Sequence, residues 1–210
     1  MNLITKNLLA LILMLFSVPG QTWASMPADE LVRETSERML TALKNEHDAL
    51  KANPAKLYTL TEEIILPHFD FERISSWVLG KYWREATPEQ KSRFTQEFRN
   101  LLVRTYATAM LEYSGQEIKY LPFKGDTGAN TVTVRTEVVQ PGGPAIPINY
   151  SLFVKEGEWK VYDVVVENTS LVANYRSSFA NEIRQSGLDA LIEKLASRSN
   201  QQSGKSAVAE

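Results

Sequence analysis

Residues 87–113 constrain the fold more than any other part of the chain, because they predict one long amphipathic helix. Thr87 can cap the first turn, Pro88 suits the first helical position, and Gln90 completes a capping box. Apolar residues then recur at spacings of three and four, at Phe94, Phe98, Leu101, Leu102, Tyr106, Ala109, Met110 and Tyr113. Such a face either packs against a core or lines a cavity, and the pattern alone leaves both open.

After Tyr113 the apolar period changes from 3.6 residues to two, which predicts strands. Four segments rich in Val, Ile, Thr and aromatic residues are expected as strands: residues 117–123, 131–140, 145–155 and 158–167. Turn sequences such as Glu156-Gly157 separate them, so an antiparallel meander is the simplest topology. The last strand is apolar on both faces, which favours a central strand covered on both sides.

Helices are expected on either side of these strands in the sequence. Before them, residues 27–51, 54–66 and 70–79 read as helices, the first with an apolar face of Leu31, Val32, Met39, Leu40 and Leu43. After them, two further helices are expected around residues 171–183 and 188–195. The chain therefore predicts a single α+β domain in which helices wrap a four-stranded antiparallel sheet. Residues 198–210 are polar and small, and we expect a flexible tail there.

The first 24 residues have the features of a secretory signal peptide. Lys6 supplies a positive charge, an apolar run follows over residues 8–18, and small residues stand at Thr22 and Ala24. The run is too short to span a membrane. We expect cleavage near Ala24, which would export a domain of residues 25–197. The sequence contains no cysteine, so disulfides, thiol chemistry and a lipid anchor at the cleavage site are not expected.

Motifs for catalysis, metal binding and nucleic-acid binding are missing from the sequence. The formal net charge is −2 without basic clusters, which disfavours nucleic acid as a partner. No serine nucleophile elbow, zinc-binding motif or phosphate-binding glycine loop occurs. His68, Asp70 and Glu72 alternate, but Asp70 is better placed to cap a helix than to bind a metal. Asp163 is an isolated carboxylate on an apolar strand, for which a structural hydrogen-bonding role is favoured over a catalytic one.

Two blocks of the sequence carry a family resemblance. The first is LPHFDFERISSWVLGKYWREATPEQKSRFTQEFRNLLVRTYATAMLEY, residues 66–113, and the second is VVVENTSLVANYRSSFANEIRQSGLDALIEKLAS, residues 164–197. Their most specific parts are VLGKYW followed by ATPEQ, the F-x-x-x-F-R-x-L-L pattern at residues 94–102, and SGLDAL. Together they resemble the MlaC, or toluene-tolerance, family of periplasmic phospholipid-binding proteins, over residues 29–197.

The resemblance implies a helix-wrapped sheet similar to the nuclear-transport-factor-2-like cone, with acyl tails in an internal apolar cavity. It implies a monomeric periplasmic carrier that passes phospholipid between an outer-membrane lipoprotein complex and an inner-membrane ABC transporter with its lipid-binding ring protein. Such transport would maintain the lipid asymmetry of the outer membrane. No catalytic residue, metal or cofactor is implied, apart from phospholipid as cargo. An enzyme acting on an apolar substrate through Asp163 and a structural envelope adaptor remain the alternatives.

The residues expected to touch lipid are inferred from the apolar faces of the predicted helices and strands. They are Val78, Phe94, Phe98, Leu101, Leu102, Tyr106, Met110, Val132, Val134, Ile146, Ile148, Tyr150, Leu152, Val164, Val166, Leu171, Val172, Tyr175 and Phe179.

Overall fold

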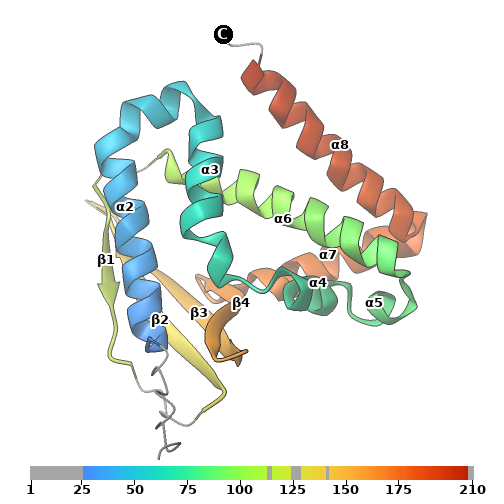
Figure 1. Ribbon diagram of the computed structural model, residues 1–210, viewed down its shortest axis with the longest axis horizontal. Helices are drawn as coiled ribbons and strands as arrows, with labels where there is room; N and C mark the ends of the chain where they lie inside the picture. The colour runs from blue at the N-terminus through green and yellow to red at the C-terminus, as the bar shows by residue number, and fades with distance from the viewer. Residues whose placement is uncertain (1–25, 113–114, 124–128, 141, 208–210) are drawn as a thin grey trace, which may run out of the picture.

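The computed structural model describes residues 26–112, 115–123, 129–140 and 142–207, and it has an α+β fold (Figure 1). The predicted signal peptide and Tyr113 lie outside these residues. The helices are α2 (Ala28–Ala52), α3 (Pro54–Ile64), the 3₁₀ turn η1 (Leu66–His68), α4 (Phe71–Leu79), α5 (Lys81–Glu85), α6 (Pro88–Met110), α7 (Leu171–Ser186) and α8 (Leu188–Ala207). The strands are β1 (Glu117–Tyr120), β2 (Thr131–Val139), β3 (Ile146–Lys155), β4 (Glu158–Val166) and β5 (Thr169–Ser170). None of the described helices is long and apolar enough to cross a membrane.

Helix α6 begins with the capping box that the sequence predicts. The backbone N–H of Gln90 donates to Thr87 Oγ1 over 3.2 Å, and the backbone N–H of Thr87 donates to Gln90 Oε1 over 3.0 Å. Two of the donors that a helix start leaves unpaired are thereby satisfied. The helix then crosses the molecule and links the sheet side to the helical side (Figure 1).

The sheet is an antiparallel meander in the order β1-β2-β3-β4-β5, so it has five strands and the predicted number of four is wrong. The additional strand β5 pairs with Val165 and Val166 of β4. Glu167 and Asn168 form the turn between them with φ angles of 48° and 66°. Two successive positive φ angles are typical of a tight hairpin turn. Without a glycine, this turn gives only a weak hairpin signal in the sequence.

A β-bulge in β4 changes the side of the sheet on which the following side chains lie. Leu152 pairs with Val161 and Ser151 pairs with Asp163, which leaves Tyr162 as the extra residue. Val161 and Val164 therefore lie on the same face of the sheet. The bulge accounts for part of the apolar pattern on both sides of β4, which lies between β3 and β5 in the sheet. On its far side β4 pairs with only two residues of β5 and makes one bridge, to Phe69.

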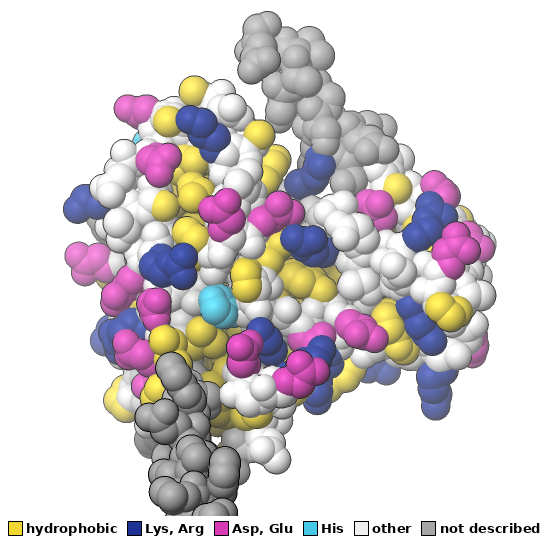
Figure 2. Space-filling model, viewed as in Figure 1, with side chains coloured by type: hydrophobic (Ala, Val, Ile, Leu, Met, Phe, Trp, Pro, Cys, Tyr) yellow, Lys and Arg dark blue, Asp and Glu magenta, His cyan; other side chains and the backbone are white. Residues whose placement is uncertain are grey.

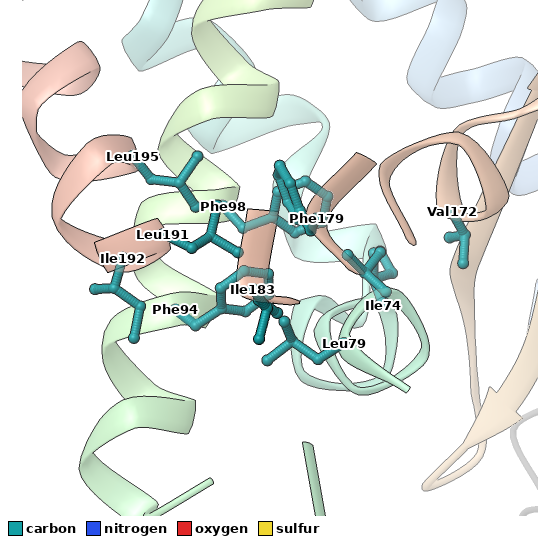
Figure 3. Packing of buried hydrophobic residues seen from close by; sticks show 11 residues of the cluster. Ile74, Leu79, Phe94, Phe98, Val172, Phe179, Ile183, Leu191, Ile192 and Leu195 are labelled. Atoms are coloured by element: carbon teal, nitrogen blue, oxygen red, sulfur yellow. The ribbon is translucent and has the colours of Figure 1, made fainter. Parts of the chain in front are cut away.

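The buried apolar residues form three separate clusters. The first lies among α4, α6, α7 and α8, where Phe94, Phe179 and Leu191 pack together (Figure 3). The second lies between the start of α2 and one face of the sheet, and includes Val32 and Leu152. The third joins the far half of α2 to α3 and the end of α6. The space where the three clusters meet is not filled by side chains.

Helix α8 continues beyond the residues that pack on α6. Leu195 is the last residue of α8 in the first cluster, and the helical backbone runs on to Ala207. Most of the predicted tail is therefore helical in the structure. Its flexibility in solution stays a prediction.

Candidate functional site

A cavity of about 400 Å³ lies at the junction of the three clusters, between α2, α6 and the sheet. Each cluster contributes to its wall, the first through Ile74, the second through Val32 and the third through Leu43. The volume falls within the range of small-molecule binding sites. Because the wall is almost entirely apolar, the cavity suits a hydrocarbon better than a polar metabolite.

Nine of the nineteen predicted lipid-contacting residues line this cavity. They come from α6, β3, β4 and the start of α7: Phe98, Leu102, Tyr106, Met110, Ile148, Tyr150, Val164, Leu171 and Val172. The structure thus brings the C-terminal half of the α6 face together with one face of the sheet. Whether these residues contact lipid stays a prediction.

The other ten predicted residues lie outside the cavity wall. Val78, Phe94, Leu101, Tyr175 and Phe179 belong to the first cluster or pack against it, and Val132, Val134 and Leu152 belong to the second. Ile146 and Val166 are partly buried strand residues away from the wall. The apolar face of α6 therefore divides along its length. Its first half packs against α7 and α8 (Figure 3). Its second half faces the cavity.

Helix α2 supplies the largest part of the wall that the prediction missed. Seven of its residues line the cavity: Leu31, Val32, Thr35, Ser36, Met39, Leu40 and Leu43. The segment around η1 and the start of α4 adds Ile65, Leu66, His68, Phe69 and Phe71. The sequence shows the apolar face of α2 clearly. It contains no signal that this face covers the sheet with a gap between them.

Asp163 lies at the cavity wall but is engaged in holding the start of α7. The hydroxyl of Ser170 donates to Asp163 Oδ2 over 2.6 Å, and the backbone N–H of Val172 donates to Asp163 Oδ1 over 3.2 Å. Ser170 Oγ in turn accepts from the backbone N–H of Ala173 over 3.1 Å. A carboxylate at a helix N-terminus is stabilised by the helix dipole. The geometry is that of the structural role expected for Asp163.

In two other ionisable groups of the wall, burial shifts the pKa toward the uncharged form. Burial raises the pKa of the Tyr150 phenol to about 12. Burial also lowers the pKa of His68, and the nearby cations Lys160 and Arg38 lower it further. His68 is half-buried beside the cavity. Among the described residues, no group of His, Asp and Glu is arranged to hold a metal ion.

Asp70 fixes the segment that leads from η1 into α4. Its Oδ1 accepts from the backbone N–H of Arg73 over 3.0 Å, which caps α4 as the sequence predicts, and its Oδ2 accepts from Lys155 Nζ over 2.8 Å. The backbone N–H of Asp70 donates to the carbonyl of Val161 over 3.1 Å. Burial alone would raise the pKa of Asp70, but the hydrogen bonds from Lys155 and Arg73 outweigh it and lower the pKa. These contacts tie one end of the cavity to the sheet.

Comparison with known proteins places this architecture in a family. A family model described as MlaC protein matches residues 33–197. The toluene tolerance protein ttg2D of Pseudomonas putida is 33% identical over 180 residues, which cover 85% of this chain and 83% of that protein. The intermembrane phospholipid transport system binding protein MlaC of Haemophilus influenzae is 27% identical over 208 residues, covering 96% and 97%.

A solved structure has the same fold. It is the phospholipid-binding protein of Ralstonia solanacearum in complex with a phospholipid, with a TM-score of 0.77 and 30% identity. The match covers 84% of this chain and 98% of that protein. Sequence and fold therefore agree, and since the family model spans most of the chain, this protein belongs to the MlaC family.

Proposed function

We propose that this protein is a periplasmic carrier that moves phospholipid between the outer and inner membranes. The observation that carries the proposal is the apolar cavity at the junction of the three clusters, in a member of the MlaC family. The acyl tails would lie between the sheet, α2 and α6, inside a cone-like wrapping of helices, and the head group would face outward. Relatives named for phospholipid transport and binding support this assignment.

The physical need for such a carrier follows from the cost of exposing hydrocarbon to water. A lipid with about thirty methylenes would lose roughly 25 kcal/mol of favourable burial, at about 0.8 kcal/mol per CH₂. A carrier requires an apolar cavity and no proton-transfer chemistry. The family is one of phospholipid-binding transport proteins and not of enzymes, and the hydrogen bonds of Asp163 suit a structural role. We assign phospholipid as cargo and no other cofactor.

The partners of such a carrier would be the two membrane complexes between which it moves. We propose an outer-membrane lipoprotein complex on one side and an inner-membrane ABC transporter with a lipid-binding ring protein on the other, served by a monomeric carrier. This traffic would maintain the lipid asymmetry of the outer membrane. Export through the signal peptide, with cleavage near Ala24, would place the protein between the two membranes.

Mass spectrometry of solvent extracts from the purified protein tests the proposal. Intact phospholipid in stoichiometric amount is the expected result. Free fatty acid or lysophospholipid would instead indicate an enzyme that acts on lipid. An extract free of lipid, from protein that also takes up none from vesicles, would indicate a structural adaptor whose cavity has no such cargo.

A further inference from the structure

A second pocket, of about 600 Å³, adjoins the apolar cavity. The two share Leu66, Phe69 and Phe71 in their walls, so they are neighbours along the η1–α4 segment. Figure 2 shows an apolar hollow in the face that carries α3, α4 and α6, with acidic and basic side chains around it. We call the pocket of about 600 Å³ the charged groove. Its charged walls come from the end of α3, from α6 at Arg99, and from the β3–β4 hairpin.

The charged groups of the groove are arranged as ion pairs of opposite sign. Arg99 Nη2 lies 3.1 Å from Glu62 Oε1, and Lys160 Nζ lies 2.7 Å from Glu158 Oε2. Lys160 also donates to the carbonyl of Pro67 over 3.0 Å. A guanidinium carries five N–H groups and a carboxylate about four lone-pair sites, so both kinds of group can bind a further partner. The two carboxylates are exposed, at 52% for Glu62 and 71% for Glu158, and the two cations are partly exposed.

The third ion pair of the groove is part of its framework. The side chain of Asp70 is only 7% exposed, and it both caps α4 and accepts from Lys155. Breaking that pair would leave a buried carboxylate without its cation. A bound group would therefore interact with the pairs Arg99–Glu62 and Lys160–Glu158.

On these grounds we propose that the charged groove binds the head group of the carried lipid and favours a zwitterionic phosphodiester that bears a protonated amine. The proposal rests on the carrier function proposed above. The phosphate lies by Arg99 and Lys160, and the ammonium lies by Glu62 and Glu158. The groove holds three cations and four anions, since Glu156 adds a carboxylate. A head group with a phosphate and no amine brings a further negative charge into this surplus, whereas a zwitterion brings none.

A competition between two lipids tests the proposal. Lipid-free protein is incubated with vesicles that contain equal amounts of phosphatidylethanolamine and phosphatidylglycerol with identical acyl chains, and the lipid it takes up is measured by mass spectrometry. We expect an enrichment of phosphatidylethanolamine of about two- to fivefold, the ratio that an exposed ion pair supports. Added salt should reduce it, because exposed charges are screened.

The outcomes separate this proposal from the carrier function. Full loading with both lipids in their vesicle ratio would overturn the groove proposal and leave the carrier function intact. Protein that takes up neither lipid would overturn both.

Charge-neutralising variants then test which residues cause the preference for phosphatidylethanolamine. Glu62→Gln and Glu158→Gln should each shift uptake toward phosphatidylglycerol. Glu193→Gln is the matched control, because Glu193 forms a similar exposed ion pair with Arg93 between α6 and α8, away from the groove. It should leave the lipid ratio unchanged. If neither groove variant shifts the lipid ratio, or if the control shifts it equally, the groove does not select between head groups.

Discussion

Leu171 is the first residue of α7 and lies half-buried in the cavity wall. We predict that Leu171→Glu lowers lipid affinity by at least about 2 kcal/mol, or more than tenfold, because an unpaired carboxylate would face hydrocarbon. The lipid-free protein should tolerate the change better, since water can reach the carboxylate in an empty cavity. Native mass spectrometry measures the lipid content, and circular dichroism checks the fold.

Two variants control for the position and for the charge. Leu171→Met keeps an apolar side chain and should keep the lipid. Val139→Glu adds the same charge at an exposed strand position and should leave the lipid content unchanged. A full lipid load in Leu171→Glu would show that acyl chains do not reach this part of the wall.

For Asp163 we predict that Asp163→Asn preserves lipid binding and lowers the free energy of unfolding by about 1 kcal/mol. An amide can still accept from the backbone N–H of Val172 and can donate to the Ser170 hydroxyl. Asp163→Ala, which removes both contacts, should destabilise the protein more, by about 1–3 kcal/mol. Chemical denaturation and lipid extraction measure the two effects. An unprocessed substrate accumulating on Asp163→Asn would contradict the carrier function and favour an enzyme.

Asp70 gives a prediction about acid stability. Its pKa in the folded protein is lowered below the ordinary value of 3.8, so its stabilisation is complete at higher pH and is lost as pH falls through the folded pKa. We expect Asp70→Asn to keep the cap of α4 but to lose the charged pair with Lys155, at about 1–2 kcal/mol near neutral pH. The difference from wild type should disappear in strong acid, as measured by denaturant unfolding across pH.

Lys155→Gln serves as the matched control, because it removes the same pair from the other side. Its loss of stability should also disappear in strong acid, but it should be larger near neutral pH, because the buried Asp70 carboxylate is left without its cation. A difference between wild type and Asp70→Asn that persists at the lowest pH would mean that the ion pair is not the source of the effect.

At the level of elements, the end of α8 is expected to be dispensable. Leu191, Ile192 and Leu195 anchor the helix to α6, together with the hydrogen bond from Gln90 to Asp189 over 2.8 Å. We predict that truncation after Ser197 changes the free energy of unfolding by less than about 0.5 kcal/mol and leaves the lipid content unchanged. Truncation after Ala190 is the contrasting variant, which removes the anchors and should abolish folding. Loss of lipid on the shorter truncation would show that the end of α8 contributes to cargo binding.

The elements differ in how far their sequences determine them. The capping box at Thr87 and the cap at Asp70 are local patterns, so the starts of α6 and α4 could be predicted correctly. The bulge at Tyr162 arises from the pairing of β4 with β3. Simple alternation would put Val161 on the face opposite Val164, but the bulge brings both into the cavity wall. The fifth strand depends on two positive φ angles in residues other than glycine.

The candidate site was predictable only in part, for a related reason. Periodicity identifies which face of a helix is apolar, but not whether that face meets side chains or a cavity. Phe94 and Phe98 belong to one face of α6, yet Phe94 lies in the packed cluster and only Phe98 reaches the wall. That difference depends on where α7 and α8 stop covering α6, which involves contacts distant in sequence.

At the level of the whole molecule, we expect the cavity to couple lipid content to stability. We predict that removal of lipid lowers the melting temperature, because a ligand that binds only the native state stabilises it, by about 2.7 kcal/mol at a hundredfold excess over Kd. Hydrogen exchange should increase most in α2 and α3, since much of the apolar face of α2 borders the cavity. Helix α8, which packs on α6 away from the cavity, should keep its protection and serves as the internal control. A uniform increase in exchange would show that the three clusters unfold together.

Under the proposed function, the contribution of all three clusters to the cavity wall has a consequence for how the carrier releases its lipid. Handing over a lipid leaves the carrier in its less stable form, so the protein itself opposes unloading. A receiving complex could overcome this cost by binding the lipid more tightly than the carrier does, or by binding the empty carrier more tightly than the full one. In the second case, thermodynamic reciprocity means that lipid binding weakens the affinity of the carrier for that complex by the same factor. The cavity would thus couple the lipid content of the carrier to its affinity for the receiving complex.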